Sequence, residues 1–276
     1  VPLMSREEIK ETSVLESLKN IITNRPLLAV ILANFFNSFK SVGGSSESYF
    51  WLNNTGSLLN QTICGLFTGI PNYIMVPVAA KMVKKWGARA TSIIAGLFGF
   101  FAYMTLFFVG FHPFGQTFKD HYIFNLIWVI FGLTICGLPN KILNVSGQIV
   151  TAEALDYMEW KHGLRNEALV TTVQGYFGKL ATSVTGWLSG MVLTWINYVP
   201  LTDSLGNAIP QTDPTMLNGI WAIFCILPAL ARGLYGVSFI IYPIHGDLQQ
   251  QMIVELAEKR AQRLAEQDAK DHQANA

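Results

Sequence analysis

The amino-acid sequence predicts an all-α membrane protein with six transmembrane helices. Of its 276 residues, 51% are hydrophobic and 13% are charged, a composition too apolar for an ordinary soluble domain of this length. Six apolar runs follow one another along the chain, and each is long enough to cross a hydrocarbon core of about 30 Å. Basic residues gather on alternate connections between these runs, as expected for a chain that crosses a membrane repeatedly.

These runs divide the chain into three parts. Residues 1–25 are predicted to form a cytoplasmic linker, in which apolar residues from Val14 to Ile22 recur at helical spacing and indicate an amphipathic helix. Residues 26–245 form the predicted six-helix bundle, and residues 246–276 form a cytoplasmic tail. The spans are expected at about 27–52, 58–80, 90–110, 122–150, 167–195 and 217–243.

The basic residues also predict the orientation of the chain. They lie in the leading segment, in the connections at 81–89 and 161–165, and in the tail. The remaining connections carry almost none, so the positive-inside rule places both termini in the cytoplasm. The tail is expected either to form an amphipathic helix from Gln249 that ends near Gln267, or to be a solvated segment.

A lysine in the fifth span is the most informative residue of the sequence. Lys179 follows Glu167 by 12 residues, which places it about 18 Å along a helix and near the middle of the membrane. A charge at that depth costs at least about 2.5 kcal/mol unless it faces water or an acidic group, so it indicates the watery cavity of a transporter. The alternative interpretation is a lysine that snorkels to the interface or makes a structural ion pair.

Small residues follow one face of the same span. They recur every three or four residues and include Thr171, Gly175, Gly178 and Thr182. A neighbouring helix or a ligand can approach such a face closely. Simple helix packing is the alternative interpretation.

The fourth span carries a polar stripe. Lys141, Asn144 and Gln148 recur at steps of three and four residues, starting just after Pro139. They share one helix face, and amides inside a membrane need partners or water, so the stripe is predicted to line a cavity or its cytoplasmic mouth. The alternative is that these side chains only form hydrogen bonds between helices.

Other charged residues occur within predicted spans. Lys40 and Glu47 are seven residues apart in the first span, so they share a face and are expected near the outer mouth of the cavity. Arg232 lies in the last span, where a structural or gating ion pair is the favoured interpretation.

A dense charged turn joins the fourth and fifth spans. We expect its charges to form a network that closes a cytoplasmic gate and breaks when the protein changes state. The alternative is a solvated loop whose charges set the topology. The residues predicted to act in this gate are Asp156, Glu159, Arg165 and Glu167.

This segment resembles the signature of a known family. The run Asp-Tyr-Met-Glu-Trp-Lys-His-Gly-Leu-Arg-Asn-Glu from Asp156 to Glu167, with Gln174 and Lys179 downstream, is similar to that of the glycoside-pentoside-hexuronide:cation symporters. Asn-Arg-Pro-Leu-Leu at 24–28 and Ile-Leu-Pro-Ala-Leu at 226–230 also match. The resemblance covers the whole chain and falls on the C-terminal half of the family's major facilitator fold.

The resemblance implies a function and roles for several residues. A member of this family carries a sugar together with H⁺ or Na⁺ between two six-helix halves, so the N-terminal half would be a further partner. By resemblance, Lys179 lies at the cation and sugar sites, and Gln174 donates a hydrogen bond to the sugar. Asn144 stands where a well-known member has a tryptophan near its sugar, which indicates a different glycoside.

No other chemistry is indicated by the sequence. There is no phosphate-binding glycine loop, no metal-ligand spacing and no nucleophile beside a base. We therefore expect neither an enzyme nor a nucleic-acid-binding protein, and no cofactor beyond a coupling cation. A multi-pass sugar symporter of the cell membrane, in contact with lipid, is favoured. A non-transporting sensor or scaffold, and a carrier of a lipid-like amphiphile, are the alternatives.

Overall fold

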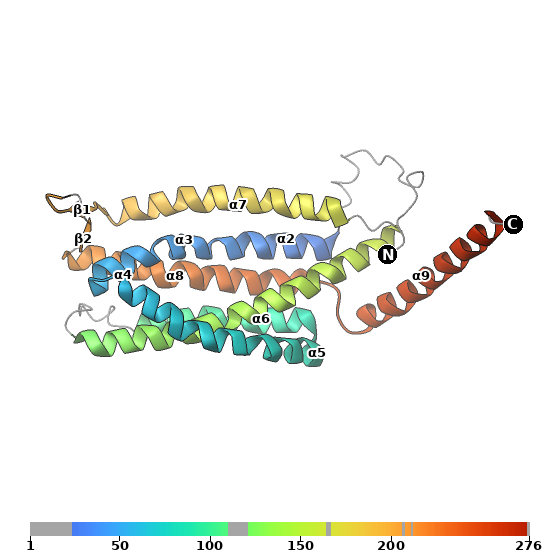
Figure 1. Ribbon diagram of the computed structural model, residues 1–276, viewed down its shortest axis with the longest axis horizontal. Helices are drawn as coiled ribbons and strands as arrows, with labels where there is room; N and C mark the ends of the chain where they lie inside the picture. The colour runs from blue at the N-terminus through green and yellow to red at the C-terminus, as the bar shows by residue number, and fades with distance from the viewer. Residues whose placement is uncertain (1–23, 110–120, 164–166, 206–207, 211, 275–276) are drawn as a thin grey trace.

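The computed structural model describes residues 24–109, 121–163, 167–205, 208–210 and 212–274. The chain is mostly helical, as predicted, and its long helices lie alongside one another while the C-terminal helix projects from one end (Figure 1). The predicted amphipathic helix before residue 24 lies outside the described residues. In chain order, the described elements are α2 (Arg25–Ser38), α3 (Lys40–Ser45), α4 (Glu47–Thr55), α5 (Leu59–Val109), α6 (Tyr122–His162), α7 (Glu167–Trp195), β1 (Leu201–Thr202), β2 (Ala208–Ile209), α8 (Pro214–Ser238), the 3-10 helix η2 (Phe239–Ile241) and α9 (Asp247–Ala274).

Four helical stretches of the described chain are long and apolar enough to cross a membrane. They make the protein a multi-pass membrane protein. α7 is not among them, although it has 29 residues. A two-stranded ribbon, which the sequence did not predict, joins α7 to α8 with Leu201 opposite Ile209. The four stretches are Arg25–Thr55, Leu59–Val109, Tyr122–Lys161 and Pro214–Ile241.

α5 contains two helical segments that meet at Gly87. This glycine has φ 80° and ψ 161°, a left-handed conformation that a residue with a side chain rarely adopts. Asn72 and Leu106, which would lie about 51 Å apart on a straight helix, both contact α6 at glycines only five residues apart, Gly137 and Gly132. The chain therefore reverses at Gly87, where the sequence predicted a connecting loop between two spans.

The first predicted span is also divided. Instead of one unbroken helix over 27–52, the stretch Arg25–Thr55 forms α2, α3 and α4, which are separated by turn residues with helical dihedral angles at Phe39 and Ser46. α3 packs closely on α8, because a Cβ added at Gly43 would lie 2.5 Å from Cγ of Pro228. Glycine favours the helical conformation weakly but permits this contact.

α6 is longer than predicted and ends at His162, not near residue 150. Val150, Ala154 and Met158 recur every four residues and are buried in the core, so the helix continues past the membrane-length apolar run. Gly163 then ends it with φ 73°. Asp156 and Glu159 therefore lie on a helix, whereas the sequence placed them in a turn.

α8 lies in the centre of the bundle. Its buried side chains include Trp221 and Phe224, and Phe224 stacks on Phe50 with ring centroids 4.7 Å apart. Near its other end, α8 meets α5 backbone to backbone: a Cβ added at Gly96 would lie 2.7 Å from Cα of Gly236. Small residues at a crossing let two membrane helices approach closely.

We predict that Gly96→Ala destabilises the protein despite the higher helix propensity of alanine. The added methyl group would overlap the backbone of α8, and overpacking of this kind costs about 1–3 kcal/mol. Thermal denaturation of the detergent-purified full protein, followed by size-exclusion chromatography, measures the effect. Gly69→Ala on the same helix is the control, because a Cβ there meets nothing within 4 Å. Equal stability of both variants would contradict the prediction.

Candidate functional site

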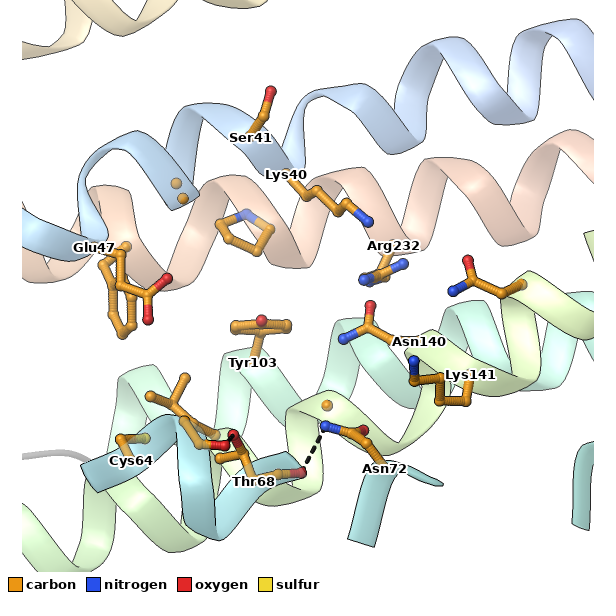
Figure 2. Close-up of a pocket in the computed structure, with 18 residues that line it drawn as sticks. Lys40, Ser41, Glu47, Cys64, Thr68, Asn72, Tyr103, Asn140, Lys141 and Arg232 are labelled. Atoms are coloured by element: carbon orange, nitrogen blue, oxygen red, sulfur yellow. Dashed lines mark hydrogen bonds between the residues drawn. The ribbon is translucent and has the colours of Figure 1, made fainter. Parts of the chain in front are cut away.

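A polar cavity of about 490 Å³ opens between α3, α4, α5, α6 and α8. This volume is within the range of small-molecule sites, about 300–1,000 Å³. Figure 2 shows that charged and amide side chains from opposite sides point into it. The polar residues that line the cavity include Lys40, Glu47, Thr68, Asn72, Tyr103, Asn140, Lys141, Asn144 and Arg232.

The divided first span brings two charges to the cavity. Lys40 begins α3 and Glu47 begins α4, and both side chains line the cavity. The contact between Gly43 and Pro228 holds the intervening turn of α3 against α8. Lys40 therefore projects from a short helix that is fixed by its neighbour, and Glu47 follows directly at the start of α4.

Arg232 is the most deeply buried charge of the cavity, with 3% of its surface exposed. Its Nη1 donates a hydrogen bond of 2.9 Å to Oδ1 of Asn37, and its Nε has no hydrogen-bond partner among the described residues. Its side-chain stem lies on Gly99, where an added Cβ would come within 3.1 Å of Cγ. The ion pair predicted for Arg232 is not found among the described residues.

The polar stripe on α6 reaches the cavity in part. Lys141 and Asn144 line it, whereas Gln148 is exposed on α6 beyond it. Nζ of Lys141 also lies 4.6 Å from the ring centroid of Tyr73, a cation–π contact that holds the ammonium group at the wall.

Several polar residues of the cavity were not identified from the sequence. Asn140 lies one residue outside the predicted stripe, and Asn72 and Tyr103 belong to the two segments of α5. Asn72 donates to the carbonyl oxygen of Thr68 at 2.8 Å. Single amides and phenols inside apolar runs give little signal, so only the reversal of α5 reveals that they meet.

The predicted residues of the fifth span lie elsewhere. α7 packs on α2 and α3, on the side away from α5 and α6 (Figure 1). Lys179 and Gly175 are exposed, Gln174 is partly buried, and none of the three lines the cavity. A Cβ added at Gly175 would meet nothing within 4 Å, so this small-residue face is open. The roles expected for these residues therefore stay predictions.

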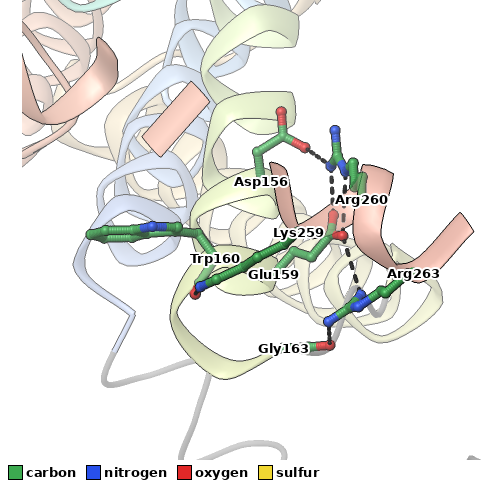
Figure 3. Close-up of polar contacts among 7 residues, drawn as sticks. All are labelled: Asp156, Glu159, Trp160, Gly163, Lys259, Arg260 and Arg263. Atoms are coloured by element: carbon green, nitrogen blue, oxygen red, sulfur yellow. Dashed lines mark hydrogen bonds and ion pairs between the residues drawn. The ribbon is translucent and has the colours of Figure 1, made fainter. Parts of the chain in front are cut away.

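The charges at the end of α6 contact the C-terminal helix. Figure 3 shows Arg260 of α9 between Asp156 and Glu159, with Nη2 2.8 Å from Oδ1 of Asp156 and Nε 3.3 Å from Oε1 of Glu159. Nη1 of Arg263 lies 3.6 Å from the same oxygen of Glu159. Glu159 is buried, so these contacts raise the pKa of the Arg260 guanidinium, first through its hydrogen bond to Glu159.

Further hydrogen bonds join α9 to α6. Nε1 of Trp160 donates to Oε2 of Glu255 at 2.7 Å. A hydrogen bond from Gln251 and this one from Trp160 lower the pKa of Glu255, so the carboxylate is ionised at neutral pH. The tail is helical as far as Ala274, beyond the end predicted near Gln267.

Two of the four residues predicted to form the gate make ion pairs in the structure. Asp156 and Glu159 form ion pairs, but with arginines of α9 that the sequence analysis did not select. Glu167 begins α7 and is exposed. Arg165 lies outside the described residues.

The long helices and the cavity indicate the class of protein to which the chain belongs. Long apolar helices surround a polar cavity, which is the arrangement of a multi-pass membrane protein with a small-molecule site. The chain belongs to the MFS/sugar transport protein family, whose model matches residues 4–246. The family resemblance inferred from the sequence is thereby confirmed. This is a family of transport proteins and not of enzymes.

Several curated proteins are similar to the chain. It is 30% identical to the uncharacterized symporter YjmB of Bacillus subtilis over 258 residues, 92% of this chain and 51% of that protein. It is 22% identical to the isoprimeverose transporter of Lactiplantibacillus pentosus, covering 92% and 49% of the two chains. A putative sulfoquinovose importer of Escherichia coli is 27% identical, covering 82% and 45%. The chain thus spans about half the length of these relatives.

We predict that Arg260→Gln loosens α9 from α6. The variant loses the contacts to Asp156 and Glu159, worth about 1 kcal/mol for a partly exposed pair, so amide hydrogens of residues 247–266 should exchange about fivefold faster. Hydrogen–deuterium exchange with mass spectrometry measures this. Gln262→Ala is the control because it lies about 200° around the same helix from Arg260. Identical exchange in both variants would contradict the role of Arg260.

Proposed function

We propose that this chain is the C-terminal half of a secondary transporter that carries a sugar together with H⁺ or Na⁺ by alternating access. Membership of the sugar transport family and the polar cavity of about 490 Å³ are the observations that carry the proposal. The names of the relatives refer to both neutral and acidic sugars, so they leave the charge of the substrate open. The half-length match supports a second half as partner.

Six crossings fit this proposal. The two segments of α5 would supply two, and the stretch Arg25–Thr55, α6, α7 and α8 would supply one each. The turn between the two segments of α5, the end of α6 and the start of α9 lie at one end of the bundle (Figure 1). Lys84, Lys85 and Arg89 flank the Gly87 turn, so the positive-inside rule supports a cytoplasmic location for that end and for both termini of the chain in the cell membrane.

The open face of α7 is where we place the coupling residues. Lys179 and Gln174 would face the second half, and Lys179 would take part in cation coupling while Gln174 and Gly175 face the sugar. Lys141, Asn144 and Gln148 would contribute from α6, the first two from the cavity wall. The exposed apolar side chains of α5 and α6 would contact lipid.

The contacts between α6 and α9 would belong to the cytoplasmic gate. Asp156 and Glu159 would close it through Arg260 and Arg263, and Glu167 would join them as the halves move. A cluster of ion pairs is suited to biasing such a two-state element.

Uptake into vesicles tests the proposal directly. We expect the full protein that contains this chain to accumulate one class of glycoside, pentoside or uronide when a H⁺ or Na⁺ gradient is imposed, and not without it. Absence of uptake of every sugar by folded protein would contradict the function. Competition by lysolipids in place of sugars would instead indicate an amphiphile carrier.

Lys179→Ala should abolish gradient-driven accumulation while the protein is still produced and inserted. A mid-membrane cation on an open helix face has no packing role to lose, so the loss should be confined to coupling. The measurement is initial uptake with and without the gradient, normalised to the amount of protein. Thr194→Ala, also exposed on α7, should transport normally. Unchanged coupled uptake by Lys179→Ala would remove that residue from the mechanism.

A further inference from the structure

The cavity is lined by more cationic than anionic side chains, and the two kinds lie in different parts of it. Three cationic side chains line it, Lys40, Lys141 and Arg232, against one carboxylate, Glu47. Figure 2 shows Lys40 and Arg232 directed toward each other from α3 and α8, and Glu47 on the far side of Tyr103. One end of the cavity is therefore cationic.

Arg232 has unused binding capacity at that end. A guanidinium group has five N–H donors. One of its nitrogens is bonded to Asn37, and its buried Nε has no partner in the described structure. Removing a charge from water without a counter-charge is strongly unfavourable. A buried arginine beside a lysine, with no carboxylate of the described residues paired to it, is therefore expected to receive an anion.

The third cation of the cavity is less available. Lys141 is engaged with the ring of Tyr73. Asn140 lies below Arg232 and offers an amide to a hydroxyl group, and the ring of Tyr103 separates the cationic end from Glu47 (Figure 2). An aromatic ring with neighbouring amides suits the body of a sugar, whereas the planar fork of arginine suits an acid group.

We propose that Lys40 and Arg232 bind the acid group of a sugar acid, a carboxylate or a sulfonate, and so select anionic over neutral sugars. This inference rests on the proposed sugar transport. The acid group takes the place of the missing counter-charge, so its binding removes the cost of the buried cation. Arginine supplies the directed hydrogen bonds, and the lysine adds charge without fixed geometry.

A matched set of ligands tests the inference. Methyl β-D-glucuronide, methyl β-D-glucoside and the 6-sulfo analogue of that glucoside differ only at carbon 6. We expect the full protein to bind or transport at least one of the two acids about tenfold to a hundredfold better than the neutral sugar, as charge-assisted hydrogen bonds allow. Isothermal titration and competition for uptake give the ratio.

The variants separate binding from folding. Arg232→Gln should remove the preference and leave affinity for the neutral sugar within about twofold, because the amide keeps polar contacts but loses the charge. Lys40→Gln should reduce the preference for acids several-fold. This variant tests the inference if Arg232→Gln, which changes a buried residue, does not fold. Lys85→Gln removes the same charge at the Gly87 turn, outside the cavity, and should leave the preference intact.

Each other outcome overturns the inference. If the neutral sugar is bound and transported as well as the acids, the transport function stands and the selectivity is wrong. If Arg232→Gln weakens all three ligands equally, the arginine pairs with an acid of the second half and not with the substrate. If no sugar of any kind binds to folded protein, the transport function itself fails, and this site fails with it.

Discussion

The close crossing of α5 and α8 is the constraint on which the rest of the structure depends. Because Gly96 and Gly236 have no side chains, the two backbones touch, and α8 can lie in the centre of the bundle. One turn from this crossing, Arg232 lies across Gly99, and two turns from it Pro228 receives Gly43 of α3. The position of each cavity wall thus follows from glycines that allow backbones to approach.

The charged groups discussed above lie in two regions, the cavity and the end of α6, which differ in whether the charges are paired. In the cavity, a buried cation has no acidic partner among the described residues, which is costly for stability until an anion binds beside it. At the end of α6, the carboxylates of Asp156 and Glu159 are instead satisfied by arginines of α9. Pairing serves attachment at one end, and its absence serves recognition in the cavity.

The sequence predicted features that depend on local spacing. Apolar runs indicated the membrane class, and steps of three, four and seven residues brought Lys141 and Asn144, or Lys40 and Glu47, to one wall. It predicted that the chain reverses between residues 80 and 90, but not that one residue, Gly87, makes the turn between two helical segments, because a single glycine in a charged segment gives no distinct signal. Nor did it pair Asp156 with Arg260, since that contact joins residues about a hundred positions apart and depends on where the tail helix lies.

The low hydropathy of α7 has a consequence for how the protein is made. Glycines, threonines and Lys179 leave this helix outside the set that is apolar enough to enter a membrane by composition alone. If α7 crosses the membrane as proposed, its insertion during synthesis depends on helices already in place, and α2 and α3, which it contacts, are synthesised first. The order of the helices along the chain is thus suited to their assembly, because α7, which is outside that apolar set, emerges from the ribosome after the helices that it contacts.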